Sequence, residues 1–377
     1  MRNEGFRTLF PMEDIAVMGI WELLPHLNKI RIRLKQTVEA ARLFQPHVVV
    51  TVDSKGFSFR FLKQLKARYA WKDDSPVHVH YVTPSFWAWK GGETRLKGLC
   101  EFIDHILCIL PFEEEICRLN GLSATYVGHP LLEDDLNLDQ ELTPFSHKRK
   151  FKGNGDDFLH KHGLLRGSPL ITLLPGSRLQ EVTRMLPLFL RTVEQMKDAF
   201  PELSIVIPVA PNYHVETYIE KEIQQWSLSV LTILIPGAST YEKYDAFSAS
   251  NAAVCTSGSA VMELQLVGLP CVIAYRAHLL TEWLIRLRTK LQFISLPNIL
   301  LDSPIIPEYL FGECTSNNLA SVLRKLILDD SARQQQIASA EQLFDLLCRP
   351  LCGVMSSNCC CPSLIAASAI LQAQRQQ

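Results

Sequence analysis

Residues 170–178, LITLLPGSR, decide the fold class of this chain. An apolar run leads into Gly176 and Ser177 and then into a helix-like segment, which predicts a buried strand, a tight turn and a helix start. The unpaired backbone N–H groups and the positive dipole end of such a helix favour an anion. We therefore predict a parallel, helix-covered sheet that carries an anion site at this turn.

A second turn of the same kind follows the apolar run at residues 252–255 and reads TSGS at residues 256–259, with Glu263 close behind. Two such turns indicate a nucleotide diphosphate at the carboxyl edge of a parallel sheet. Neither contains a P-loop or a G-x-G-x-x-G fingerprint. Either turn alone also fits ordinary strand-to-helix punctuation, but Arg178 adds a guanidinium suited to phosphate.

Length and composition favour a globular protein of two domains. The chain has 377 residues, of which 47% are hydrophobic and 20% charged. Its formal net charge of −1 gives no reason to invoke nucleic acid. No apolar stretch approaches the ~20 residues of a membrane helix, and no signal-peptide-like region opens the chain. We expect a soluble chain or one that lies on a membrane surface.

The eleven cysteines do not predict a metal site. Six are scattered, mostly in apolar runs, where free cysteine behaves as a small buried hydrophobe. The other five crowd residues 348–361 without the paired spacing of a zinc site.

Apolar runs alternate with amphipathic stretches, which predicts two Rossmann-like parallel-sheet domains. Strands are expected at residues 47–53, 78–84, 105–111, 125–128, 170–174, 203–208, 231–235, 252–255 and 271–274. We expect an N-terminal domain over residues 1–145, a linker or insertion over 146–169, a second domain over 170–345, and a Cys-rich tail with a final helix over 346–377. The basic triplet at residues 148–150 is expected on a solvated surface. Two such domains facing a cleft suit an enzyme with two substrates.

Asp53 is the leading candidate for a general base, because it ends the run at residues 48–52 and should lie at the edge of the sheet. The alternative is an N-cap for the next helix. His129, between Gly128 and Pro130, is a second candidate base or a residue that orients a chain crossing. His78 and His80 share one face of a strand and are expected to be satisfied within the fold.

Arg276, after Tyr275, and Asn298 are candidate contacts to sugar, uracil or phosphate, because both fall in loops at the edge of the second domain. Surface capping is the alternative for each. Two segments, residues 17–27 (with Trp21 and Leu24) and 283–290, combine apolar residues with cations and suit an anionic membrane surface. Packing on the core is the alternative for both segments.

Several motifs occur in a family order: MEDIAVMG at 12–19, VDS at 52–54, HYVTPSFWAW at 80–89, LPFE at 110–113, VGHP at 127–130, LLPGSR at 173–178, TSGSAVME at 256–263, YR at 275–276 and SLPN at 295–298. With them the chain resembles the lipid-A-disaccharide synthases, inverting glycosyltransferases of the two-domain GT-B architecture, over roughly residues 3–339. The insertion at residues 133–169 interrupts the resemblance.

The resemblance implies transfer of 2,3-diacylglucosamine from its UDP donor to 2,3-diacylglucosamine 1-phosphate, with a β-1,6 link and release of UDP. It implies that Asp53 is the base and that no metal or other cofactor is required. It also implies peripheral membrane binding and pairing into a homodimer through the C-terminal regions. The substrate-binding residues that it implies are Gly176, Ser177, Arg178, Ser257, Gly258, Ser259, Glu263, Tyr275, Arg276 and Asn298.

The sequence departs from the family at both ends. A complete member opens with a strand and a Gly-Glu-x-Ser-Gly-Asp loop before the region where Met1 stands, so we expect either a truncated product or a non-catalytic variant that binds UDP or dimerises. Residues 351–361 look foreign, which suggests a plant-type copy in the mitochondrion rather than a bacterial protein on the cytoplasmic face of the inner membrane. A transferase or epimerase acting on UDP-N-acetylglucosamine is a further alternative.

Overall fold

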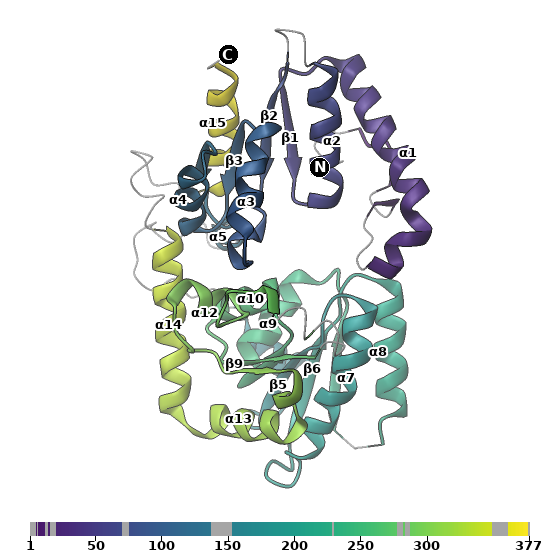
Figure 1. The fold of residues 1–377 in the computed structure, drawn as a ribbon. Helices are drawn as coiled ribbons and strands as arrows, with labels where there is room; N and C mark the ends of the chain where they lie inside the picture. The colour runs from purple at the N-terminus through teal and green to yellow at the C-terminus, as the bar shows by residue number, and fades with distance from the viewer. Residues whose placement is uncertain are drawn as a thin grey trace. The chain divides into compact units, whose positions relative to one another are not determined.

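The computed structural model describes residue 5 and residues 7–11, 14–15, 20–69, 75–136, 153–227, 230–276, 282, 287–348 and 361–375; at residues 20–25, 134–136 and 374–375 it describes the backbone alone. The chain forms two compact units (Figure 1). The first unit takes residues 1–138 and 347–377, and the second takes residues 139–346. Each has a parallel sheet with helices packed on it, so the predicted fold class is confirmed.

The first unit holds a four-stranded sheet in the order β1-β2-β3-β4. The strands are β1 (Val48–Val52), β2 (Val77–Tyr81), β3 (His105–Cys108) and β4 (Ala124–Tyr126). Its helices are α1 (Ile20–Phe44), α2 (Lys55–Arg68), η3 (Ser85–Ala88), α3 (Gly92–Lys97), η4 (Gly98–Glu101), α4 (Pro111–Leu119), α5 (Leu131–Leu136) and α15 (Pro362–Arg375).

The core of the first unit lies between the sheet and helices α1, α2 and α3. Leu62 and Leu65 of α2 are fully buried with Leu96 of α3 and Ile106 of β3. On β1, buried and exposed residues alternate, as expected for a strand with one covered face. Helix α15 packs on β2 and β3 and runs alongside them in Figure 1.

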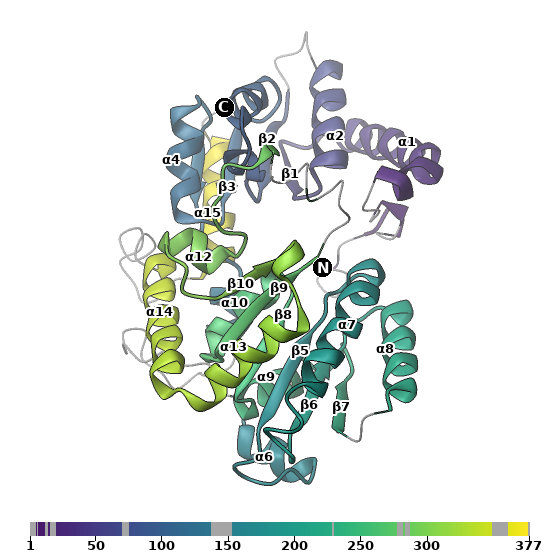
Figure 2. The ribbon, with the colours of Figure 1, turned by 60° about the horizontal axis from the view of Figure 1, so that its bottom comes forward.

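The second unit holds a six-stranded sheet in the order β10-β9-β8-β5-β6-β7 (Figure 2). The strands are β5 (Leu170–Leu174), β6 (Ser204–Pro208), β7 (Leu231–Ile235), β8 (Ala252–Cys255), β9 (Cys271–Tyr275) and β10 (Glu308–Leu310). Its helices are α6 (Gly155–Lys161), α7 (Leu179–Glu194), α8 (Tyr213–Gln225), α9 (Thr240–Ala249), α10 (Ser259–Val267), α12 (Leu296–Leu301), η5 (Phe311–Glu313), α13 (Ser316–Leu328) and α14 (Asp330–Cys348). The direction of chain progression reverses between β5 and β8, which is the switch point of a Rossmann-type sheet.

The structure differs from the expected organisation in two places. Helix α6 falls within the segment expected to be a linker, yet its Phe158 is buried against β5, β6 and β7. The C-terminal helix α15, expected in a separate tail, belongs to the first unit. All nine expected strands are present with ends that differ by a few residues, and β10 is an additional strand. The basic triplet at residues 148–150 lies outside the described residues.

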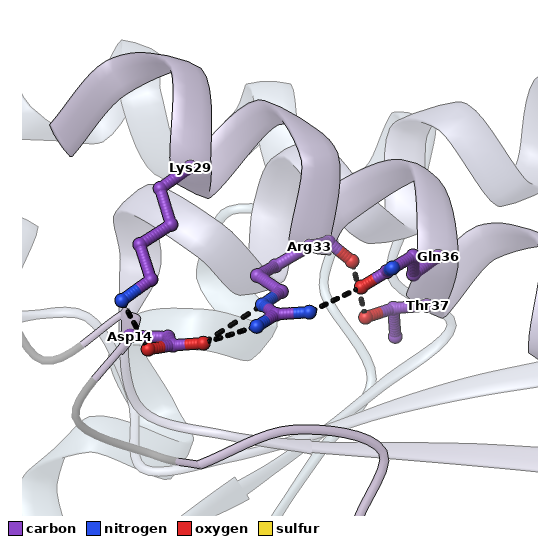
Figure 3. Close-up of polar contacts among 5 residues, drawn as sticks. All are labelled: Asp14, Lys29, Arg33, Gln36 and Thr37. Carbon is purple, nitrogen blue, oxygen red and sulfur yellow. Dashed lines mark hydrogen bonds and ion pairs between the residues drawn. The ribbon is translucent and has the colours of Figure 1, made fainter.

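Two cations of helix α1 pair with a nearly buried aspartate of the MEDIAVMG motif, Asp14 (Figure 3). Asp14 is nearly buried and pairs with Lys29 and with Arg33, whose nitrogens lie 2.6 and 2.8 Å from Oδ2 of Asp14. Arg33 also donates to Oε1 of Gln36 at 2.8 Å. Within the described residues, no helix is both long and apolar enough to cross a bilayer.

Candidate active site

The structure brings the two glycine turns together at one edge of the second sheet. They follow β5 and β8, which are neighbouring parallel strands with Leu174 opposite Cys255. The N–H of Thr256 donates to the carbonyl of Leu174 at 3.0 Å and ties the two strand ends to each other. Both turns therefore lie at the switch point of the sheet, where ligands bind in folds of this kind.

Both turns depend on glycine and open onto helix N-termini. Gly176 has φ 122°, and a Cβ there would lie 2.7 Å from Cβ of Glu181. Gly258 has φ 145° with open space around it. The N-cap positions of α7 and α10, Arg178 and Gly258, make no side-chain capping bond. The positive dipole ends of two helices thus lie at the same edge of the sheet, which favours an anion there.

Charged side chains surround these turns. Arg178 is half exposed, and its Nη1 lies 2.9 Å from Oε1 of Glu181. Glu263 pairs with Lys243 of α9 at 2.7 Å. Lys243 was not among the residues expected from the sequence, because only the packing of α9 against α10 brings it here. A cation therefore lies beside each turn.

Tyr275 and Arg276 follow β9, the strand next to β8. Nε of Arg276 donates to the carbonyl of Cys314 at 2.7 Å, and the carbonyl of Arg276 accepts from Arg184 of α7 at 3.1 Å. The ring of Tyr275 packs edge-on against Phe311, with centroids 6.1 Å apart. The backbone of Arg276 is therefore held at the carboxyl end of β9, and Nε of its guanidinium already has a partner.

Asn298 is bonded entirely inside the second unit. It is fully buried, donates to the Ile306 carbonyl at 2.8 Å and to Glu308 at 2.9 Å, and accepts from the Ile306 N–H at 2.9 Å. Both polar atoms of its amide are used inside the fold, which favours a positioning role over the expected direct contact with substrate.

Glu308 is the centre of this network, and its own sequence context gave no signal for it. Its carboxylate accepts from the N–H groups of Ile294 and Ser295 and from the Ser295 hydroxyl at 2.7–3.0 Å. The carbonyl of Ile294 in turn accepts from the hydroxyl of Ser257 at 3.2 Å. Asn298 and Glu308 thus hold the loop against which the second turn rests.

In the first unit, Asp53 lies at the carboxyl end of β1, as expected. Its side chain is exposed, and its N–H donates to the carbonyl of Tyr81 at 3.0 Å. Asp53 and Ser54 both have left-handed backbone, with φ 44° and 46°. Such conformations are costly for non-glycine residues and collect at functional sites. The N-cap of α2 is Ser54, so the capping alternative for Asp53 does not hold.

His78 and His80 of β2 are both fully buried in the fold. His80 is fully buried, and its Nδ1 lies 2.8 Å from the hydroxyl of Thr51. Burial lowers the pKa of His80 to about 4 against the opposing charge of Asp53. Burial also lowers the pKa of His78, whose Nδ1 lies 2.9 Å from the Phe102 carbonyl. The expectation that both histidines are satisfied within the fold is therefore correct only for Nδ1, because Nε2 of His78 and of His80 has no partner among the described residues.

His129 serves the backbone rather than the solvent. Its Nδ1 accepts from the Leu131 N–H at 3.2 Å at the start of α5, and burial lowers its pKa to about 4. This geometry supports orientation of the chain over a role as base.

Glu113 is a buried carboxyl that the sequence analysis passed over. It is 2% exposed and accepts from the Trp87 indole N–H at 3.0 Å and from the Leu110 N–H at 3.2 Å. Burial raises the pKa of Glu113 to about 7, and the bonds from Trp87 and Leu110 oppose that rise. The LPFE and PSFWAW motifs are therefore joined through one side chain.

The described part of the chain gathers no three His, Cys, Asp or Glu side chains as a metal site would need. Of the six scattered cysteines, five are buried and Cys100 is exposed. The membrane candidates at Trp21 and Leu24, and residues 283–286, have side chains outside the described residues.

Comparison with known proteins gives one consistent family. The family model described as lipid-A-disaccharide synthetase matches residues 1–353. A probable mitochondrial lipid-A-disaccharide synthase of Arabidopsis thaliana is 53% identical over 387 residues, covering 100% of this chain and 83% of the relative. The lipid-A-disaccharide synthase of Rhodospirillum centenum is 38% identical over 337 residues, covering 89% and 78%.

Solved structures share the fold. The UDP-GlcNAc 2-epimerase of Neisseria meningitidis, bound to UDP-GlcNAc, has a TM-score of 0.54 at 13% identity over 87% of this chain and 82% of its own. A complex of MnaA of S. aureus with UDP has a TM-score of 0.55 at 12% identity over 87% and 80%. At these identities the likeness concerns the fold alone.

Proposed function

The chain belongs to the lipid-A-disaccharide synthase family, and on that premise we propose that it transfers 2,3-diacylglucosamine from its UDP donor to 2,3-diacylglucosamine 1-phosphate. The observation that carries the proposal is the pair of uncapped helix N-termini that meet at the switch point of the second sheet. This arrangement suits the diphosphate of a nucleotide sugar.

The donor binds to the second unit. The N–H groups at the starts of α7 and α10 face the diphosphate, and Arg178 adds a positive charge beside them. Glu263, which pairs with Lys243, accepts hydrogen bonds from hydroxyl groups of the nucleotide or sugar. Tyr275 and Arg276 complete the donor side, while Asn298 acts through the loop that supports Ser257.

Asp53 of the first unit takes the proton from the acceptor hydroxyl. The acceptor oxygen then forms the new bond to C1 of the donor sugar as the bond from C1 to the UDP oxygen breaks, with inversion at C1. The electron pair leaves with UDP, where the helix N-termini and Arg178 offset the developing charge. No residue needs to become covalently attached to the sugar.

We extend the proposal to location and assembly. The mitochondrial relative supports a mitochondrial protein. The acyl chains of both substrates favour a peripheral position on a membrane surface. A homodimer is proposed as the assembled form, and sedimentation of the purified chain tests it.

The test of donor binding is calorimetric titration of UDP into the full chain, into Arg178→Ala and into the control Arg191→Ala. Arg191 is an exposed arginine in the last turn of the same helix. We expect Arg178→Ala to weaken UDP binding by about tenfold or more, the contribution of a charge-assisted hydrogen bond. Arg191→Ala should bind UDP like the wild type. Equal affinities in all three would count against the donor site.

The test of chemistry is turnover of both acylated substrates by wild type and Asp53→Asn. Removal of a general base costs about 10²–10⁴-fold in rate, and UDP affinity should be unchanged. A wild-type chain that binds UDP without turnover would support the non-catalytic alternative instead. Turnover of UDP-N-acetylglucosamine without acyl chains would favour the other transferase or epimerase class.

A further inference from the structure

Two cations of the first unit contact one aromatic ring, and one of them, Lys55, follows Asp53 by two residues. Nζ of Lys55, the first residue of α2, lies 5.4 Å from the centroid of the Phe86 ring. Cζ of Arg95, in α3, lies 5.8 Å from the same centroid. Both positive charges thus lie within about 6 Å of one point, the range of a cation–π contact.

Neither cation is neutralised within the described residues. The structure gives Lys55 and Arg95 no ion pair with a described carboxylate, although both side chains are exposed. Three other cations of this unit are paired with carboxylates: Arg33 with Asp14, Lys66 with Asp104 and Arg118 with Glu114. Each of these positive charges would stabilise an anion bound beside the Phe86 ring.

The surrounding backbone adds to this positive potential. Helix α2 has 14 residues, no acidic residue in its first turn and no side-chain cap. Its positive dipole end therefore adds to the charge of Lys55. Phe86 follows β2, and Asp53 follows β1, the strand paired with β2, so ring and candidate base share the carboxyl edge of one sheet.

We propose that Lys55 and Arg95 bind the phosphate monoester of the sugar-phosphate acceptor, with the Phe86 ring positioning both charged groups. The inference rests on the proposed function, because that function supplies an acceptor with a phosphate. An acceptor of this kind needs a base at its reacting hydroxyl and a cationic site for its phosphate elsewhere on the sugar. Asp53 and the Lys55–Arg95 pair supply these two groups from one edge of the sheet.

The diphosphate of the donor is the other source of phosphate chemistry. We assign it to the second unit, where the turns at Gly176 and Gly258 already provide an anion site. The two assignments predict opposite effects of the same substitutions on UDP and on the acceptor, so one set of variants separates them.

The experiment measures equilibrium binding of diacylglucosamine 1-phosphate, of diacylglucosamine without the phosphate, and of UDP, the lipids being presented in neutral detergent micelles. The variants are Lys55→Met and Arg95→Met in the full chain. The matched control is Lys63→Met, because Lys63 lies on the same helix α2 with its Nζ 4.7 Å from the Phe102 ring. Turnover by wild type is measured in parallel.

We expect Lys55→Met and Arg95→Met each to weaken binding of the phosphorylated lipid by about tenfold, the contribution of one charge-assisted hydrogen bond. Binding of the phosphate-free lipid and of UDP should be unchanged, and Lys63→Met should match wild type. The wild-type preference for the phosphorylated lipid should also shrink at high salt.

Three results would overturn the inference. The first is equal affinity of the wild type for both lipids. The second is an equal loss of affinity for both lipids in the variants. The third is a loss of affinity for UDP while affinity for the phosphorylated lipid is unchanged. Failure of the proposed function is a different result, namely absence of wild-type turnover, and it leaves the binding comparison of the two lipids fully informative.

Discussion

Among the carboxyl groups that the structure describes, Glu113 is the most deeply buried. Its pKa is raised by burial to about 7, so between its ordinary value of 4.5 and 7 the folded chain holds a proton that the unfolded chain has lost. The stability contributed by this proton is present at low pH and disappears as pH rises toward 7. The loss amounts to about 3 kcal/mol at most.

Glu113→Gln replaces the protonated carboxyl by a neutral amide of similar shape. We expect the difference in unfolding free energy between variant and wild type to shift in favour of the variant as pH rises from 5 to 8. Urea denaturation at several pH values measures it. Glu114→Gln is the control, because Glu114 lies on the same helix and pairs with Arg118 at the surface. A difference that stays constant with pH would show that Glu113 is ionised throughout.

Gly176 and Gly258 allow a paired prediction about the turns. An added Cβ at Gly176 meets Cβ of Glu181 at 2.7 Å in addition to an unfavourable φ, whereas at Gly258 only φ is unfavourable. Gly176→Ala should therefore reduce UDP affinity more than Gly258→Ala does. Calorimetry of both variants compares them, and the reverse order would mean that the second turn approaches the ligand more closely.

At the residue scale, the sequence located the turns but not their partners. Gly176, Arg178 and Asp53 follow apolar runs directly, so their places at strand ends could be predicted. Lys243 and Glu308 come near the site only through packing between segments distant in the sequence, so no local sequence pattern predicts them. Asn298 stands in a family motif, but the motif could not distinguish a ligand contact from a buried brace.

At the scale of elements, apolar runs sufficed to predict nine strands, because parallel strands that are largely buried carry continuous apolar sequence. Strand β10 has three residues and no such run, so it could not be found this way. Helix α6 was hidden for a similar reason: its seven residues bury a single large side chain, Phe158, within a highly charged stretch.

The attachment of α1 gives a prediction at this scale. Hydrogen bonding by Lys29 leads the causes that lower the pKa of Asp14, with Arg33 adding to it, and partial burial opposes them. The stabilisation by Asp14 is therefore present above its ordinary pKa and is lost as pH falls through the lowered one. Asp14→Asn should make the backbone amides of α1 exchange faster with deuterium at neutral pH.

The control for this prediction is Gln36→Ala, which removes only the outer contact of Arg33 (Figure 3). Its exchange should resemble wild type. Unchanged exchange in Asp14→Asn would mean that α1 is held by its packing against α2 alone.

At the scale of the whole molecule, the chain returns to its first unit at the end. Residues 347–377 belong to that unit, where the Tyr126 hydroxyl donates to the Leu347 carbonyl at 2.7 Å. The Ser363 N–H donates to the carboxylate of Glu133 at 3.2 Å. This return could not be predicted from the sequence, because the segment before α15 carries a pattern unlike the rest of the chain.

The return predicts that a substitution near the C-terminus destabilises the first unit and spares the second. Ile365 of α15 is 5% exposed, whereas its neighbour Leu364 is 53% exposed. Ile365→Ala should cost about 2–4 kcal/mol by leaving a cavity against the sheet, and Leu364→Ala should cost much less. Deuterium exchange should accelerate in β2 and β3 of Ile365→Ala but not in β5 and β8, with UDP affinity unchanged. Equal acceleration of exchange in both sheets would mean that the two units unfold as one. The proposal that the second unit binds UDP independently of the first would then be wrong.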